Sequence, residues 1–239
     1  MKKLLIIVLF LVSAGTTATA QLQTRTWINS GHNRAVGWYG NLDLIQEYRI
    51  DNTTFIAGEE FAILNADNTI FNAGMLKIKH HVQYKNFEID PFISFQYRPF
   101  SKYIREKIFV FGLLKETPHW NLSLGNFSRI YSLSKDMQEL YPDDDASSVK
   151  EWHNLLYDIE YLFQPRLGDK KMNYSLGVSN QSDFLYQPAT IPMLYGRCWT
   201  YINERQYVFF ETRYQTAGSN NLQADYFGVI LKGGLFWAL

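Results

Sequence analysis

Apolar and polar residues alternate along much of this chain, with the two-residue period of a β-strand whose faces meet different surroundings. In residues 38–50 the even positions are mainly apolar, whereas the odd positions include Asp43, Glu47 and Arg49. The same split recurs in residues 87–98, 154–164 and 172–179. Less regular alternation occupies residues 55–64, 70–84, 107–116, 120–131, 191–202 and 205–215. With a first strand near residues 22–28 and a last one at residues 224–239, the pattern predicts about twelve strands, and ten remains an alternative.

Connections between these expected strands alternate in length. Short ones fall at residues 51–53, 85–86, 117–118 and 203–204, and longer ones at residues 99–105, 132–150, 182–189 and 216–221. Two links break this alternation. Residues 165–171 are long where a short turn is expected, and residues 65–68 are short where a longer loop is expected. Short turns that alternate with longer external loops are typical of a membrane barrel with both termini on the side of the turns. The chain is therefore predicted to be all-β, folded as a transmembrane antiparallel up-and-down β-barrel.

The last stretch, residues 224–239, supports this interpretation. Val229, Leu231, Leu235, Trp237 and Leu239 share one face of the expected strand. This stretch resembles the closing strand of bacterial outer-membrane β-barrels, in which the assembly machinery recognises such a C-terminal signal at the positions of Leu235, Trp237 and Leu239. The match is incomplete, because Leu239 stands where these barrels usually have an aromatic residue. The resemblance implies outer-membrane lipid and the barrel-assembly machinery as partners.

The first twenty residues predict export. Lys2 and Lys3 precede an apolar run at residues 4–12, and Ala18 and Ala20 supply small residues at the spacing that a signal peptidase requires. We expect residues 1–20 to be a cleaved secretory signal peptide and residues 21–239 to be the barrel domain. The expected location is the bacterial outer membrane, reached through the secretory pathway.

Composition narrows the classes of protein further. The chain has 23 basic and 23 acidic residues, so nothing indicates a nucleic-acid partner. Its mean hydropathy is −0.22, yet aromatic residues make up 16% of the chain. A membrane barrel reconciles the two values, because only every second residue meets lipid and aromatic girdles lie at both interfaces. A single cysteine, Cys198, excludes an intramolecular disulfide.

If the apolar face meets lipid, the opposite face lines the interior with charges of both signs. The residues expected there are Asp43, Glu47, Arg49, Lys77, Lys79, His81, Glu88, Asp90, Arg98, Asp158, Glu160, Arg197, Glu211, Arg213 and Lys232. Such a lining predicts either a polar channel of weak selectivity or a small barrel closed by its own ion pairs.

No catalytic or metal-binding residues are predicted. The five histidines do not form the compact His-x-Ser arrangement of outer-membrane phospholipases, and the adjacent His80 and His81 would point to opposite faces of a strand. No cofactor is expected.

The leading interpretation is an integral outer-membrane barrel acting as a narrow, porin-like channel for small solutes. Three alternatives stay open: an outer-membrane hydrolase of lipid or peptide, which would show His and Ser side by side at one barrel rim; a structural or accessory barrel; and a soluble periplasmic β-barrel binding protein. The solute and the oligomeric state are left open.

Overall fold

The computed structural model describes residues 21–33, 37–64, 70–85, 87–99, 104–133, 139, 150–163, 172–216 and 226–238. Ala18 and Ala20 of the expected signal peptide, and Leu239 of the expected C-terminal signal, lie outside these residues. The strands are β1 (Gln21–Asn33), β2 (Gly37–Ile50), β3 (Thr53–Leu64), β4 (Phe71–His80), β5 (Val82–Tyr84), β6 (Phe87–Arg98), β7 (Ile104–Glu116), β8 (Trp120–Leu133), β9 (Lys150–Phe163), β10 (Met172–Ser179), β11 (Met193–Asn203), β12 (Gln206–Thr216) and β13 (Tyr226–Ala238).

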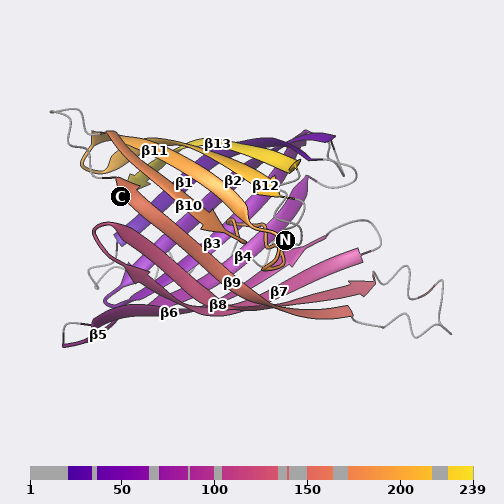
Figure 1. Ribbon diagram of the computed structural model, residues 1–239, viewed down its shortest axis with the longest axis horizontal. Helices are drawn as coiled ribbons and strands as arrows, with labels where there is room; N and C mark the ends of the chain where they lie inside the picture. Colours follow the sequence, from indigo (N-terminus) through magenta and orange to yellow (C-terminus); the bar gives the residue numbers. More distant parts are fainter. Residues whose placement is uncertain are drawn as a thin grey trace.

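Each strand pairs antiparallel with its neighbours, and the sheet closes on itself (Figure 1). β1 lies between β2 and β13, with Trp27 opposite Gly234, so the first and last strands join. β4 and β5 are two parts of one barrel strand interrupted at His81, because both pair with β6. The predicted all-β fold is therefore confirmed, with twelve barrel strands rather than ten.

The two ends of the barrel differ. Short hairpins at residues 51–52 and 204–205 lie at the end where β1 begins and β13 finishes, since Gln21 pairs with Arg49 and Gln23 with Ala238. We call this the short-turn end and the opposite one the loop end. At the first hairpin Asp51 takes a positive φ of 49°, which aspartate tolerates better than most residues.

The outward face of the barrel is an apolar belt. Ile93 is 59% exposed, and Phe111 61%, on neighbouring strands. Equivalent positions on other strands carry Leu76, Leu124, Leu176, Leu194, Phe210 and Leu231, all exposed. Within the described residues, no helix is long and apolar enough to cross a bilayer. An apolar surface of this extent on a closed barrel is suited to contact with lipid tails.

Glycines make room for large rings inside the barrel. Gly177 lies directly opposite Tyr195, and Gly112 directly opposite Phe92, on paired strands. A Cβ atom at either glycine would collide with the facing ring. These glycines allow Tyr195 and Phe92 to lie flat across the inner wall, where both rings are buried.

Candidate functional site in the barrel lumen

The connection between β10 and β11, residues 180–192, folds into the barrel. The sequence pattern predicts a longer external loop at residues 182–189, and this prediction is wrong. The connection starts at the loop end but turns into the barrel. Phe184 is only 3% exposed and Tyr186 only 5%, values that an external loop would not give. We call residues 180–192 the inward segment.

Two aromatic side chains anchor the inward segment to different parts of the inner wall. Phe184 packs with Trp27, Ile45 and Met75, which come from β1, β2 and β4. Tyr186 packs with apolar residues of β6 to β9, and its ring lies 5.5 Å from that of Phe127. Burial of these two rings favours the inward position, because each would otherwise expose a large apolar surface to water.

Cationic side chains from the wall satisfy the backbone of the inward segment. Arg213 donates to the carbonyl of residue 181 at 2.8 Å, and Arg98 donates to the carbonyl of Phe184 at 2.5 Å. Gln96 donates to the same carbonyl at 2.8 Å, and Arg129 donates to the carbonyl of Tyr186. Hydrogen bonds from charged donors are stronger than those from neutral donors. The backbone carbonyls of the segment can therefore be buried here without losing their hydrogen bonds.

Asn180 fixes the root of the inward segment. It is fully buried; its amide group donates to the carbonyls of Leu155 and Gln187, at 2.8 and 2.9 Å. Its side-chain oxygen accepts from the backbone N–H of Tyr157 at 2.8 Å. The segment therefore leaves β10 in a direction that β9 determines.

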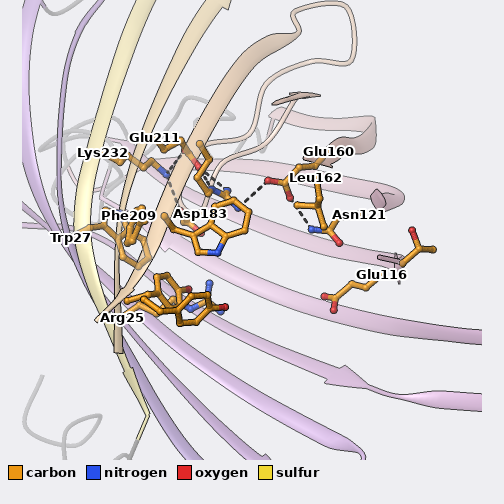
Figure 2. Close-up of a pocket in the computed structure, with 15 residues that line it drawn as sticks. Arg25, Trp27, Glu116, Asn121, Glu160, Leu162, Asp183, Phe209, Glu211 and Lys232 are labelled. Carbon is orange, nitrogen blue, oxygen red and sulfur yellow. Dashed lines mark hydrogen bonds and ion pairs between the residues drawn. The ribbon is translucent and has the colours of Figure 1, made fainter. Parts of the chain in front are cut away.

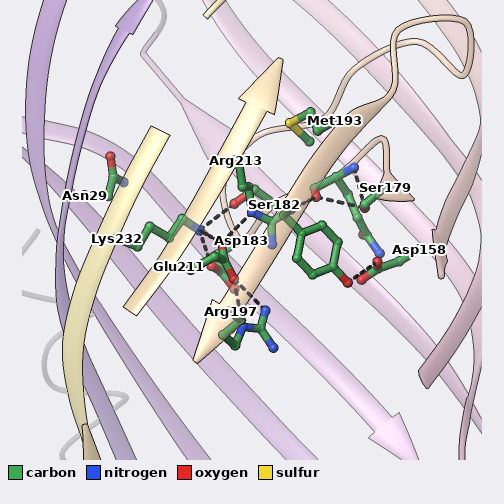
Figure 3. A network of polar contacts seen from close by, with 12 residues as sticks. Asn29, Asp158, Ser179, Ser182, Asp183, Met193, Arg197, Glu211, Arg213 and Lys232 are labelled. Carbon is green, nitrogen blue, oxygen red and sulfur yellow. Dashed lines mark hydrogen bonds and ion pairs between the residues drawn. The ribbon is translucent and has the colours of Figure 1, made fainter. Parts of the chain in front are cut away.

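The acidic tip of the segment is paired with β13. Lys232 Nζ lies 2.8 Å from Asp183 Oδ2 and 2.6 Å from Ser182 Oγ (Figure 3). Burial alone would raise the pKa of the Asp183 carboxyl, but the Lys232 ammonium outweighs it and holds this pKa below its usual value. Asp183 is therefore a carboxylate at neutral pH.

Glu211 is the centre of a charge network beside this tip. Arg213 Nε lies 2.5 Å from Glu211 Oε1, and Arg197 Nη2 lies 2.7 Å from Oε2. Arg197 also reaches Glu160 at 3.2 Å, and Lys232 lies 3.8 Å from Glu211. Buried charges are tolerated when each has a partner, and Figure 3 shows this cluster between the strands and the inward segment.

Two further polar groups lie elsewhere on the inner wall. In one, Asn29 donates to Asp43 at 2.8 Å and to Glu60 at 3.3 Å, while Arg98 lies 3.6 Å from Glu60. In the other, Asp90 contacts Lys79 at 3.3 Å and His81 at 2.7 Å.

A cavity of about 520 Å³ lies at the short-turn end, below the inward segment. Its aromatic lining residues are Trp27, Trp199, Tyr201, Tyr207 and Phe209, on β1, β11 and β12. The residues from β7 to β9 and their hairpin are Glu116, Thr117, Asn121, Glu160 and Leu162. The rest of the lining is charged: Arg25, Asp183, Arg197, Glu211 and Lys232. In Figure 2, Trp27 and Phe209 lie on one side of the cavity, with Asn121 and Glu116 on the other.

The structure brings some of the sequence-predicted lumen residues together and separates others. Glu160, Glu211 and Arg213 meet in one network, and Lys79, His81 and Asp90 in another. Of the remaining candidates, Lys77 lies 4.1 Å from the ring centre of Phe92, and Asp158 accepts from the Tyr195 hydroxyl at 2.8 Å. Arg98 holds the inward segment, and Glu88 is exposed near the start of β6.

Sequence reasoning missed several residues of the site. Asp183 lies in a connection that carried no strand pattern, and Glu60 lies in one of the less regular strands. Glu106 and Arg129 form an ion pair at 3.0 Å. Strand alternation could have located both residues, since each lies at one of the alternate positions that point into the barrel.

A hydroxyl and an imidazole also meet on the outward face. Ser128 Oγ lies 2.8 Å from His153 Nδ1, on the directly paired positions of β8 and β9 toward the loop end. Thr53 Oγ1 and His80 Nδ1 form a similar contact of 2.9 Å at the short-turn end.

No protein-family model matches this sequence, and no curated protein matches it significantly. Solved structures do match. The NanC porin superposes with a TM-score of 0.55 at 10% identity, covering 90% of this chain and 100% of its own. The translocator domain of the autotransporter NalP from Neisseria meningitidis gives 0.49 at 13% identity, with 99% and 95% covered. Outer membrane phospholipase A from Escherichia coli gives 0.46 at 7% identity, with 90% and 92% covered.

The similarity to the NanC porin bears on the fold. The closed antiparallel barrel of this chain superposes on the whole length of that porin. The chain has the fold of bacterial outer-membrane β-barrels, and this fold supports the outer membrane as its location.

Proposed function

We propose that this protein is a narrow outer-membrane channel for small polar solutes, in which the inward segment forms the constriction. The observation that carries the proposal is the position of residues 180–192, which cross the lumen and are bound to both sides of the inner wall. A barrel of twelve strands has a lumen between those of packed eight-stranded barrels and open porins. A segment folded into such a lumen narrows it to the size of small molecules.

The charges beside the constriction predict weak ion selectivity. Three cations, those of Lys232, Arg197 and Arg213, lie next to three carboxylates, so neither sign dominates beside the inward segment. The carboxylates are those of Asp183, Glu211 and Glu160. Rings of a single sign select ions strongly, whereas mixed charge does not. Phe184 and Tyr186 make apolar contacts with two parts of the inner wall. The proposed path for a solute therefore runs along the charged side.

Conductance in planar bilayers tests the proposal. The refolded protein should give small, discrete current steps that pass K⁺ and Cl⁻ with a permeability ratio near one. A variant with residues 182–189 replaced by an equally long glycine–serine linker should give larger steps, because the anchors Phe184 and Tyr186 are gone. Absence of current from both proteins, each folded by heat-modifiable gel migration, would reject the channel and favour a structural barrel.

The contact between Ser128 and His153 favours a second candidate, an outer-membrane hydrolase. A serine hydroxyl within hydrogen-bond reach of an imidazole is the arrangement that activates a serine nucleophile, and it faces the lipid near one rim. The channel remains the better supported proposal, because Thr53 and His80 make nearly the same contact at the other end. Two such pairs are what strand register alone produces wherever a hydroxyl faces a histidine.

Covalent labelling separates the two explanations of this contact. A fluorophosphonate probe should fail to label the wild-type barrel if Ser128 is structural. Labelling that disappears in Ser128→Ala and in His153→Ala, but persists in Thr53→Ala, would establish a reactive serine and support hydrolysis of lipid esters.

A further inference from the structure

We propose that the cavity at the short-turn end is a binding site for an uncharged sugar, of about the size of a disaccharide. This inference deepens the proposed function, on which it rests, by naming the class of solute that the lumen binds. The volume of about 520 Å³ lies within the range of small-molecule sites.

The aromatic wall of the cavity supplies surfaces on which a sugar ring can stack. Tyr207 stacks on Phe236, with ring centres 4.5 Å apart and planes at 14°, and it meets the Tyr201 ring edge-on at 5.6 Å. Trp199 lies on the neighbouring strand and lines the same cavity. A sugar ring has an apolar face of C–H groups, which packs against aromatic rings, and a rim of hydroxyls that does not.

The facing wall supplies partners for hydroxyl groups. Glu160 accepts hydrogen bonds from Asn121 at 2.8 Å and from Ser175 at 2.6 Å, so the position of its carboxylate is fixed. Oε1 of Glu160 also accepts from Arg197 at 3.2 Å, so Oε2 is the oxygen that has room for a further hydrogen bond. Asn121 can both donate and accept. Aromatic surface on one side and fixed acceptors on the other match the two kinds of surface on a sugar.

The charges of the cavity argue against an ionic solute. Three cations, Arg25, Arg197 and Lys232, line it together with four carboxylates, those of Glu116, Glu160, Asp183 and Glu211. Each of the three cations already contacts a carboxylate: Arg25 that of Glu47, Arg197 that of Glu211, and Lys232 that of Asp183. An anionic solute would meet no cation in excess. A cationic one would compete with the ion pairs of Glu160, Asp183 and Glu211, and only Glu116, whose side chain is 61% exposed, would be open to it. Uncharged solutes avoid both costs.

Sugar binding can be measured with and without conduction. Sucrose and maltose, added on the short-turn side of the channel, should reduce the current in a saturable manner. Sodium glutamate, lysine hydrochloride and a polyethylene glycol of similar mass should not do so at the same concentrations. Tryptophan fluorescence of the detergent-folded protein should titrate with the two sugars over the same range.

Paired variants test the aromatic wall. Trp199→Ala should weaken sugar binding at least tenfold. Trp120→Ala is the matched control, because Trp120 lies at the same end but on the outward face, against Tyr161. It should leave sugar binding unchanged.

The outcomes distinguish the two proposals. Ion current without saturable sugar binding, or equal binding by both variants, would overturn the sugar site and leave the channel intact. Sugar binding in detergent that Trp199→Ala abolishes, with no current in bilayers, would support the site and overturn the channel.

Discussion

The ammonium of Lys232 lies 2.8 Å from the carboxylate of Asp183, so the last strand of the barrel holds the tip of a segment that lies about fifty residues earlier in the chain. Because Lys232 also lies 3.8 Å from Glu211, this one cation joins the inward segment to the charge network of the wall. The position of the inward segment therefore depends on a strand that closes the barrel. In the proposed channel, a solute would pass this point between charged groups that already pair with one another.

Weakening this contact should loosen the constriction. Asp183→Asn removes the charge but keeps the size of the side chain, and Lys232 retains Ser182 and Glu211 as partners. A hydrogen bond between charged groups contributes about 1.5–3 kcal/mol, so the tip should leave its position far more often. Single-channel recordings should show more frequent and larger openings. Unchanged current steps would mean that Asp183 does not limit the path.

Loss of the Glu211 carboxylate should destabilise the barrel strongly. Glu211→Gln leaves Arg213 and Arg197 near each other without their shared anion, in a region where Arg213 is almost completely buried. Breaking a buried ion pair by removing one partner costs about 3–5 kcal/mol. Urea unfolding followed by tryptophan fluorescence measures the free energy of unfolding.

Glu116→Gln is the control, because its side chain is 61% exposed and its contact with Lys79 is 3.9 Å. That substitution should cost at most about 1 kcal/mol, and equal losses in both variants would contradict the special role of Glu211.

Much of the fold could be predicted from the sequence, because strand alternation is a local property. Each barrel strand meets lipid on one side and other side chains on the opposite side. The alternation of apolar and polar residues therefore assigns positions such as Ile93 and Leu231 to the outward face. The alternating lengths of the connections likewise predicted the two ends of the barrel. Pairing between strands then follows from the up-and-down order.

The inward segment could not be predicted in the same way. Its inward position depends on Arg98, Arg129 and Arg213, which come from three strands far apart in the sequence. The three arginines that bind its carbonyls cannot be identified from the sequence of the connection. The available local signal was the pair Phe184 and Tyr186, because an external loop seldom has two large rings so close together.

An alanine at Gly177 should disturb the inner wall. Its Cβ would collide with the Tyr195 ring, whose hydroxyl donates to Asp158 at 2.8 Å. Moving this ring in a packed interior should cost about 1–3 kcal/mol, measured by urea unfolding. Gly233→Ala is the matched control, because a Cβ there would meet only Phe210, at 4.0 Å. The control should be neutral or slightly stabilising, since alanine restricts the unfolded chain more than glycine does. A similar loss of unfolding free energy at both positions would contradict this explanation. It would mean that Gly177 is not required by the space that the Tyr195 ring needs.

An arginine on the outward belt should impair assembly, whereas one on the cavity wall should not. Ile93 is exposed in the middle of β6, where a charge would meet lipid tails, and Ile93→Arg should cost about 2–4 kcal/mol or prevent folding.

Ser94, its inner neighbour, is buried and leaves no space for a larger side chain, so it cannot serve as the control. Asn121→Arg can, because Asn121 lines the cavity and already donates to Glu160 at 2.8 Å, so the new cation would find a partner. Folding into vesicles, followed by the difference in gel migration between boiled and unboiled samples, measures assembly. Loss of the folded band in Asn121→Arg but not in Ile93→Arg would reverse the assignment of the two faces.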